Sequence, residues 1–243
     1  MKKIFLIMGA FVVISTNSFA QLAKGTFMPG IGFGYNYNSV RNHDPINGGG
    51  YSNDNTYKTS NLLGNINLGY FITDKIVLGV FGGYSQSNND NTEFQNLNNN
   101  INYLSSSTSN SILSGVFIRS YKMVKNNKFG FFGQFSSSYS FGKSSRHYSQ
   151  TNNSGFTNYS ETRGTSGMFR ASISPGIVYF ISNKVGIEAM FGNIGFNSGT
   201  YDSFNQYTQV GSGTLNSFYT NFSLSSLQLG VNFYFGKKVV DTK

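Results

Sequence analysis

The chain of 243 residues has no cysteine, no tryptophan and only three prolines. The absence of cysteine excludes disulfide bonds, a lipid-modified N-terminal cysteine and any thiolate metal site. Charged residues are also scarce, at 11% of the chain, whereas a soluble domain carries about 25%. Beyond the N-terminal segment, no apolar run approaches the ~20 residues that a membrane-spanning helix needs. The surface is therefore not built chiefly for water, and the mature chain is expected to have no helical span.

The first 20 residues have the pattern of a cleaved secretory signal peptide. Two lysines follow the initiator methionine, residues 4–14 form an apolar core, and Ser-Phe-Ala at 18–20 is a small-x-small cleavage site. A transmembrane anchor is the alternative, but the apolar run is short and polar residues follow it at once. We therefore predict export with removal of residues 1–20, which leaves one domain at residues 21–243.

A two-residue alternation of side chains recurs in about eight stretches of the chain. In residues 62–70 one parity holds Leu, Gly, Ile, Leu and Tyr, and the other holds Leu, Asn, Asn and Gly. Because successive side chains of a strand point to opposite faces, each stretch has an apolar face and a polar or side-chain-free face. With export, this pattern predicts a membrane-spanning β-barrel whose apolar face contacts lipid. The strands are expected at residues 25–39, 58–72, 75–85, 109–123, 128–142, 167–181, 184–197 and 217–235.

The connections between the expected strands alternate in length. Three are short and polar, at residues 73–75, 124–127 and 182–184. The others run about 15 to 25 residues, as in 86–108 and 144–166, and are rich in Asn, Ser, Thr, Gly and Tyr. The prediction is all-β: an eight-stranded antiparallel up-and-down transmembrane β-barrel with short periplasmic turns and long extracellular loops. Its last strand ends near Phe235, and residues 236–243 form a short basic periplasmic tail.

Aromatic side chains make up 16% of the chain and crowd the expected short-turn rim. Phe71, Tyr121 and Phe180 belong to this group and are expected at the boundary between lipid headgroups and hydrocarbon. The alternative is that these rings form the core of a soluble β-sandwich. That fold would need short loops at both ends and a more charged outer face.

The formal net charge of the whole chain is +9. A basic balance is compatible with nucleic-acid binding, but here the lysines are spread around the short-turn rim rather than gathered in one patch. We therefore expect them to contact anionic phospholipid headgroups, and we expect no nucleic-acid partner.

Three charged residues fall on the inward parity of the expected strands: Arg119, Arg170 and Glu188. Arg119 and Glu188 lie at similar distances from their turns, so we expect them to meet inside the barrel, whereas Arg170 lies nearer the loop rim. An eight-stranded barrel is just wide enough inside for side chains to fill it, so inward charges are expected to pair and plug it. The alternative is a gated ion path lined by Arg119 and Glu188.

Enzymatic chemistry has little support in the sequence. The two histidines, His43 and His147, both lie in expected outer loops, and a catalytic His needs a partner held rigidly beside it. The 29 glycines are spread through the strands and do not form a phosphate-binding loop. We predict no catalytic, cofactor-binding or metal site, and a protein that is not an enzyme.

Several segments resemble a known family. They are Phe-Ile-Arg-Ser-Tyr at 117–121, Lys-Phe-Gly-Phe-Phe-Gly at 128–133, the segment 174–184, Glu-Ala-Met-Phe-Gly at 188–192, and the end of the last strand at 229–235. Together they resemble the small porin-like outer-membrane β-barrel proteins common in Bacteroidota. The resemblance implies an eight-stranded up-and-down barrel that is inserted by the barrel-assembly machinery.

The preferred function is that of a non-enzymatic outer-membrane barrel of a Gram-negative cell. It would be structural or weakly porin-like, with a side-chain-filled lumen, and it would contact outer-membrane lipids and lipopolysaccharide as a monomer. One alternative is a surface adhesin or ligand-recognition barrel that acts through four long loops. A third hypothesis, the least favoured, is an outer-leaflet lipid-modifying enzyme that depends on His147. The sequence does not identify a ligand.

Overall fold

The computed structural model describes residues 22–46, 51–95, 101–124, 128–151, 156–205, 208–222 and 226–236. The predicted signal peptide at 1–20 and all but the first residue of the predicted tail lie outside these ranges. Within them, no helix is long and apolar enough to cross a membrane.

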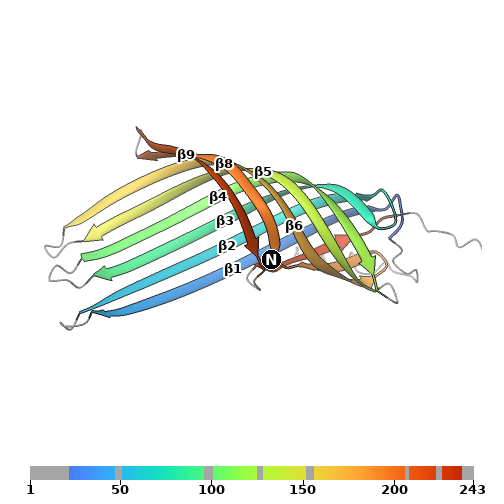
Figure 1. Ribbon diagram of the computed structural model, residues 1–243, viewed down its shortest axis with the longest axis horizontal. Coiled ribbons are helices and arrows are strands. Elements are labelled where there is room, and N and C mark those ends of the chain that lie inside the picture. Colours follow the sequence, from blue (N-terminus) through green and yellow to red (C-terminus); the bar gives the residue numbers. More distant parts are fainter. Residues whose placement is uncertain are drawn as a thin grey trace, which may run out of the picture.

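The described chain is an antiparallel up-and-down sheet of ten strands (Figure 1). The strands are β1 (Phe27–Ile46), β2 (Tyr51–Phe71), β3 (Ile76–Gln95), β4 (Ile101–Met123), β5 (Phe129–Thr151), β6 (Thr157–Ser182), β7 (Val185–Met190), β8 (Asn193–Asn205), β9 (Thr208–Asn221) and β10 (Gln228–Phe233). Each strand from β1 to β6 pairs with the next, β6 also pairs with β8, and β8 pairs with β9. β10 pairs with both β7 and β1. These pairings close the sheet into a barrel-like ring at the end that carries the short turns.

The prediction of eight strands is wrong, because two of the predicted strands are each divided in two. The predicted strand at 184–197 breaks between β7 and β8 at Gly192, whose φ of 73° lies in the left-handed region. The Gly192 N–H donates to the Ser226 hydroxyl at 3.0 Å instead of to a strand partner. The predicted strand at 217–235 breaks between β9 and β10, and Phe222 lies in this break.

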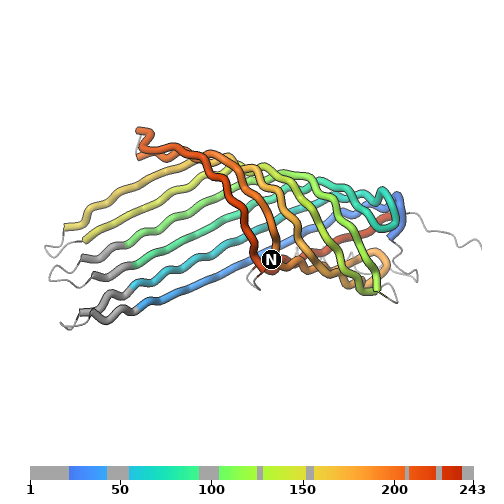
Figure 2. Tube along the Cα trace, viewed as in Figure 1, coloured from blue at the N-terminus to red at the C-terminus, as the bar shows by residue number. Residues whose placement is uncertain are grey.

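The prediction of long loops is also wrong, because the strands run far into the polar segments (Figure 2). β3 continues to Gln95 and β4 begins at Ile101, so most of the predicted loop at 86–108 is strand. Asn and Ser have low strand propensity, but their side chains here bond across neighbouring strands. Examples are the bond between the Ser85 and Ser111 hydroxyls at 2.6 Å and the Ser106 hydroxyl donating to Asp90 at 2.7 Å.

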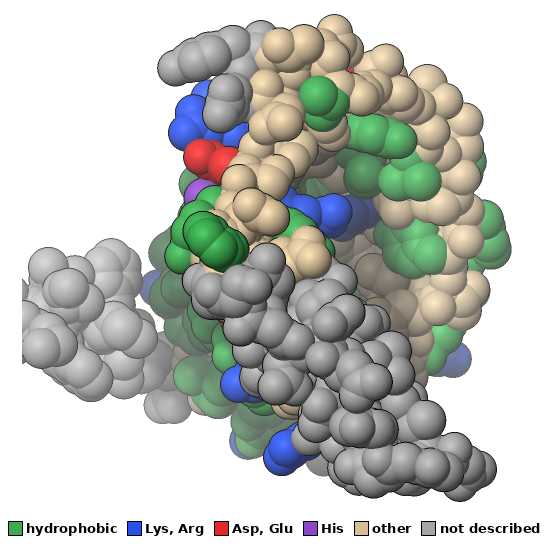
Figure 3. All heavy atoms as spheres, turned by 90° about the vertical axis from the view of Figure 1, so that its left-hand side faces the viewer, with side chains coloured by type: hydrophobic (Ala, Val, Ile, Leu, Met, Phe, Trp, Pro, Cys, Tyr) green, Lys and Arg blue, Asp and Glu red, His purple; other side chains and the backbone are tan. Residues whose placement is uncertain are grey.

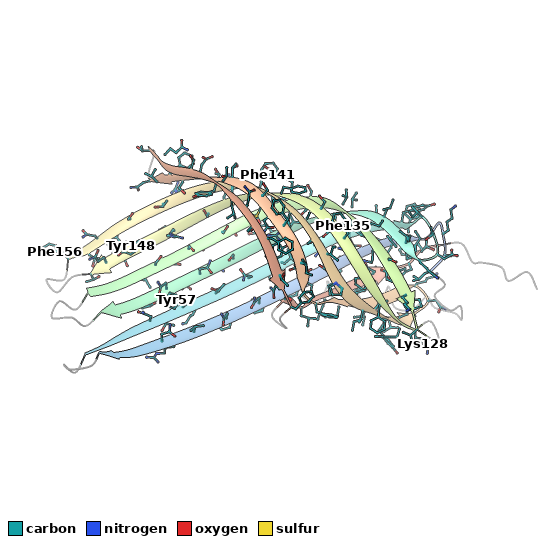
Figure 4. The ribbon with its side chains drawn as sticks, viewed as in Figure 1. Tyr57, Lys128, Phe135, Phe141, Tyr148 and Phe156 are labelled. Atoms are coloured by element: carbon teal, nitrogen blue, oxygen red, sulfur yellow. The ribbon has the colours of Figure 1, made fainter. Side chains whose placement is uncertain are left out.

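The predicted alternation between the two faces is confirmed in the described strands. Ile31, Phe33 and Leu229 are exposed on the outer wall, as are Phe135 and Phe141, which Figure 4 labels. Residues of the opposite parity line the interior. The outer wall is therefore apolar over much of its surface, as a wall in contact with lipid requires.

The ring does not close along its whole height. β9 pairs only with β8 within the described residues, and β1 pairs with β10 only from Gly30 to Gly34, apart from an isolated bridge between Phe27 and Phe235. Figure 1 shows β1 and β9 diverging toward the loop end. A seam therefore separates β1 from β9 above the closed ring.

Candidate functional site

A cluster of buried side chains fills the lumen near the turn end. Its members are inward-facing residues from the ends of β1 to β6 and from the residue after β10: Met28, Phe71, Val77, Phe117, Tyr121, Phe132, Val178, Phe180 and Tyr234. We call these nine residues, together with Arg119 and Glu188, the turn-end plug. The Tyr121 ring packs on Phe132 and on Phe71, with centroid distances of 5.5 and 5.8 Å. Close ring packing of this kind narrows the lumen at this level.

Arg119 and Glu188 form a buried ion pair at the centre of the plug. Arg119 projects from β4 and Glu188 from β7, and one guanidinium nitrogen lies 2.6 Å from a carboxylate oxygen. Each residue is only 4% exposed. The other carboxylate oxygen accepts hydrogen bonds from the Tyr121 and Tyr234 hydroxyls at 2.9 and 3.0 Å. Both oxygens of Glu188 are thus satisfied, as a buried carboxylate requires.

The rest of the Arg119 guanidinium is also satisfied. Its Nε and one terminal nitrogen donate to the Gln134 side-chain oxygen at 2.9 and 2.6 Å. The nitrogen that meets Glu188 also donates to the Tyr121 hydroxyl at 2.7 Å. The cationic carbon lies 4.3 Å from the centre of the Phe132 ring, within cation–π range. The plug is therefore held by a connected polar network as well as by apolar packing.

Two glycines make room for the rings of the plug. A Cβ atom at Gly176 would collide with the Phe132 ring, and one at Gly79 would collide with the Phe117 ring. The sequence predicts such relief of crowding only in general terms, since the glycines are spread through all the strands.

Arg170 does not join the Arg119–Glu188 pair. Its Nε donates to the Asn197 side-chain oxygen at 3.0 Å on the loop side of the plug. There it lines a polar cavity of about 130 Å³, together with Gln134 and Ser172. Figure 3, which looks at the loop end, shows the hollow of the lumen with basic side chains inside it.

Among the described residues, the neighbours of His147 on the adjacent strands are hydrogen-bonded to other side chains rather than arranged as a catalytic site. His147 lies on β5, exposed, between Ser106 and Glu161 of the neighbouring strands. The Ser106 hydroxyl donates to Asp90, however, and the Glu161 carboxylate accepts from Arg163 at 2.8 Å. That bond lowers the pKa of Glu161 below its ordinary value.

The other predicted histidine, His43, lies in β1, and its side chain is outside the described part. No cluster of three or more potential metal ligands of the His, Asp or Glu type occurs in the ranges that the structure describes.

Sequence reasoning missed the side chains that surround the ion pair. Phe71, Tyr121 and Phe180 are expected at the headgroup boundary but are buried in the plug instead. Parity provides a usable signal, because Tyr121 lies two residues after Arg119 and so shares its face. Parity also places Gln134 on the inward face, but only the register between β4 and β5 shows that it lies opposite Arg119.

No model of a known protein family matches the chain, and no curated protein matches its sequence. Among solved structures, the outer membrane protein OprG from Pseudomonas aeruginosa is similar, with a TM-score of 0.51 and 11% sequence identity. The match covers 90% of this chain and 100% of the OprG chain. The finer resemblance to Bacteroidota proteins stays a prediction. At this identity the likeness concerns the fold alone, and the chain has the fold of an outer-membrane β-barrel protein.

Proposed function

We propose that the chain is a non-enzymatic, integral outer-membrane β-barrel protein whose lumen is closed by the turn-end plug. Its role is structural or weakly porin-like. The observation that carries this proposal is the burial of the Arg119–Glu188 pair across the lumen, with every oxygen of the carboxylate bonded. A permanently open pore would need water around these charges, whereas here aromatic rings and Gln134 surround them.

The apolar outer wall and the similarity to OprG support placement in the outer membrane. In this proposal residues 1–20 direct export in a Gram-negative cell, and the barrel-assembly machinery inserts the mature chain at 21–243. The partners are outer-membrane lipids and lipopolysaccharide, and the protein works as a monomer without a cofactor.

Planar-bilayer recordings test the closed lumen. The wild-type protein, refolded and shown to be heat-modifiable on gels, is expected to give at most small or rare openings. Glu188→Ala is the matched variant, because it removes the central carboxylate and leaves the outer wall unchanged. Large and steady conductance from the wild-type protein would overturn the proposal.

A second candidate is surface recognition at the loop end. Phe156 is 73% exposed and Tyr159 is 82% exposed, and Figure 4 shows Phe156 at the outer end of the strands. Exposed aromatic rings beside Ser, Asn and Gly are suited to adaptable contacts with another molecule. Loss of cell adhesion on replacing both rings by serine would favour this candidate, and unchanged adhesion would remove it.

A further inference from the structure

The outer wall carries a groove that the closed lumen does not explain. It has a volume of about 780 Å³, and its apolar lining is Tyr84 of β3, Ile112 of β4, and Tyr139 and Phe141 of β5. These four side chains are exposed and belong to the outward parity of their strands. We call this feature the outer groove. Its volume lies within the range of about 300–1,000 Å³ that is typical of ligand sites.

Gly167 of β6 forms part of the floor of the outer groove. It is paired with Phe141 on one side and with Thr200 of β8 on the other. A Cβ atom at Gly167 would collide with the Tyr139 hydroxyl, so the ring of Tyr139 lies over the bare backbone of this residue. The rings of Tyr139 and Phe141 meet edge to face, 4.7 Å apart, and form one wall. The groove is thus shaped by an aromatic pair beside a position without a side chain.

The outer groove lies where the apolar band of the wall ends. On β5 the outward residues are predominantly apolar from Phe129 to Phe141 and become polar at Lys143. That stretch is about 40 Å long at ~3.4 Å per residue, which gives roughly 29 Å of height at a strand tilt of ~45°. The apolar band of an outer-membrane barrel is about 25 Å tall. The groove therefore opens at the loop-side boundary between hydrocarbon and headgroups.

The polar end of the outer groove offers one unpaired positive charge. Lys143 is exposed and has no hydrogen-bond or ion-pair partner among the residues that the structure describes. Asp202 also lines the groove, but its carboxylate accepts a hydrogen bond from Gln209 at 3.1 Å. Tyr84 donates its hydroxyl to the side-chain oxygen of Asn110 at 2.8 Å, so these two polar groups are already joined. Asp202 keeps its negative charge, but it lies two strands away from Lys143, with Thr165 between them. The cation left for an incoming ligand is the Lys143 ammonium, which favours an anion.

We propose that the outer groove holds one anionic lipid of the outer leaflet. Its phosphate lies on Lys143, and one of its acyl chains lies along Ile112, Tyr139 and Phe141. This inference rests on the proposed insertion in the outer membrane, because only then does the groove face lipid. It assigns to this chain a lipid site that is separate from the turn-end plug.

Native mass spectrometry of the detergent-purified, delipidated protein tests the site, with diphosphoryl lipid A as the probe. The wild-type protein is expected to bind one lipid A. Lys143→Gln removes the cation and should weaken binding about tenfold, since a charge-assisted contact to phosphate is lost. Gly167→Val fills the floor of the groove and should weaken binding to a similar extent.

Two matched variants serve as controls. Lys58→Gln removes an exposed lysine of β2 that does not line the groove, and Gly133→Val adds a side chain where a Cβ atom meets nothing within 4 Å. Both should bind lipid A as the wild-type protein does. Phosphatidylcholine should bind more weakly than lipid A, and inorganic phosphate should not displace lipid A, which separates a seated lipid from a free anion.

Equal affinity of Lys143→Gln and Lys58→Gln for lipid A would overturn the proposal, as would displacement of lipid A by inorganic phosphate. Heat-modifiable gel mobility distinguishes a failure of the lipid-site proposal from a failure of the proposed outer-membrane barrel. A protein that is not heat-modifiable refutes the membrane barrel itself, whereas a heat-modifiable protein that does not retain lipid A refutes only the groove.

Discussion

Replacing Glu188 by alanine removes the carboxylate on which the turn-end plug depends. The substitution leaves the Arg119 guanidinium buried without its counter-charge and deprives the Tyr121 and Tyr234 hydroxyls of their acceptor. Removing one partner of a buried ion pair costs about 3–5 kcal/mol. We expect the free energy of unfolding of Glu188→Ala to fall by about this amount, since the pair is only 4% exposed and Gln134 remains as the other main partner of Arg119.

The matched variant replaces both charges, as Arg119→Met with Glu188→Leu. Exchanging a whole buried pair for apolar residues of similar volume is often neutral or stabilising, so the double variant should recover most of the loss. Urea unfolding in lipid vesicles, followed by circular dichroism and by gel mobility, measures both values. If the single variant lost less than about 1 kcal/mol, the pair would behave as a solvated surface pair, and the plug would not be closed.

Conductance provides an independent measurement on the same variant. With Glu188 gone, the positive charge of Arg119 stands uncompensated beside the space that the side chain leaves. Any openings gained by Glu188→Ala should therefore favour anions, which the reversal potential in a KCl gradient reports. Cation-selective openings would contradict this account of the lumen.

Two further substitutions have defined outcomes. Gly176→Val forces a side chain into the Phe132 ring and should lower the free energy of unfolding by about 1–3 kcal/mol. The control Gly133→Val should change the free energy of unfolding by less than about 0.5 kcal/mol. Equal effects of the two variants in urea titrations would show that the plug is not tightly packed. Arg163→Gln should raise the pKa of Glu161 toward its ordinary value, because the hydrogen bond from Arg163 lowers it. A folded-state pKa that is depressed stabilises the fold above the unfolded-state pKa, and this contribution is lost as the pH falls through the folded value. An unchanged NMR titration of Glu161 in the variant would refute this cause.

The outer wall and the Arg119–Glu188 pair could be predicted because both depend on the alternation of side chains along each strand, which is a local property of the sequence. The alternation around Ile31 and Phe135 determines which side chains form the outer wall, and a shift by one residue would reverse them all. Arg119 and Glu188 share the inward parity and lie at similar distances from their turns, which was enough to bring them together.

The strand ends could not be predicted, because they depend on contacts between strands. The segments 86–108 and 144–166 are rich in Asn and Ser, and because Asn is depleted in strands on average, these segments are predicted as loops. Cross-strand bonds such as that between Ser85 and Ser111 extend the strands there. The strand break at Gly192 could not be predicted either, because the sequence does not show which of the 29 glycines adopts a left-handed backbone conformation.

Along the seam, the backbone N–H and C=O groups that would join β1 to β9 have no strand opposite them in the described chain. Hydrocarbon cannot satisfy such groups, so water from the lumen or another polar partner must reach the seam wherever it descends below the headgroups. In the proposed membrane setting, the barrel would therefore have one flank that is reached by water, whereas the rest of its circumference is apolar. Neighbouring lipids and proteins would consequently meet a polar surface on one side of the barrel and an apolar surface on its other sides.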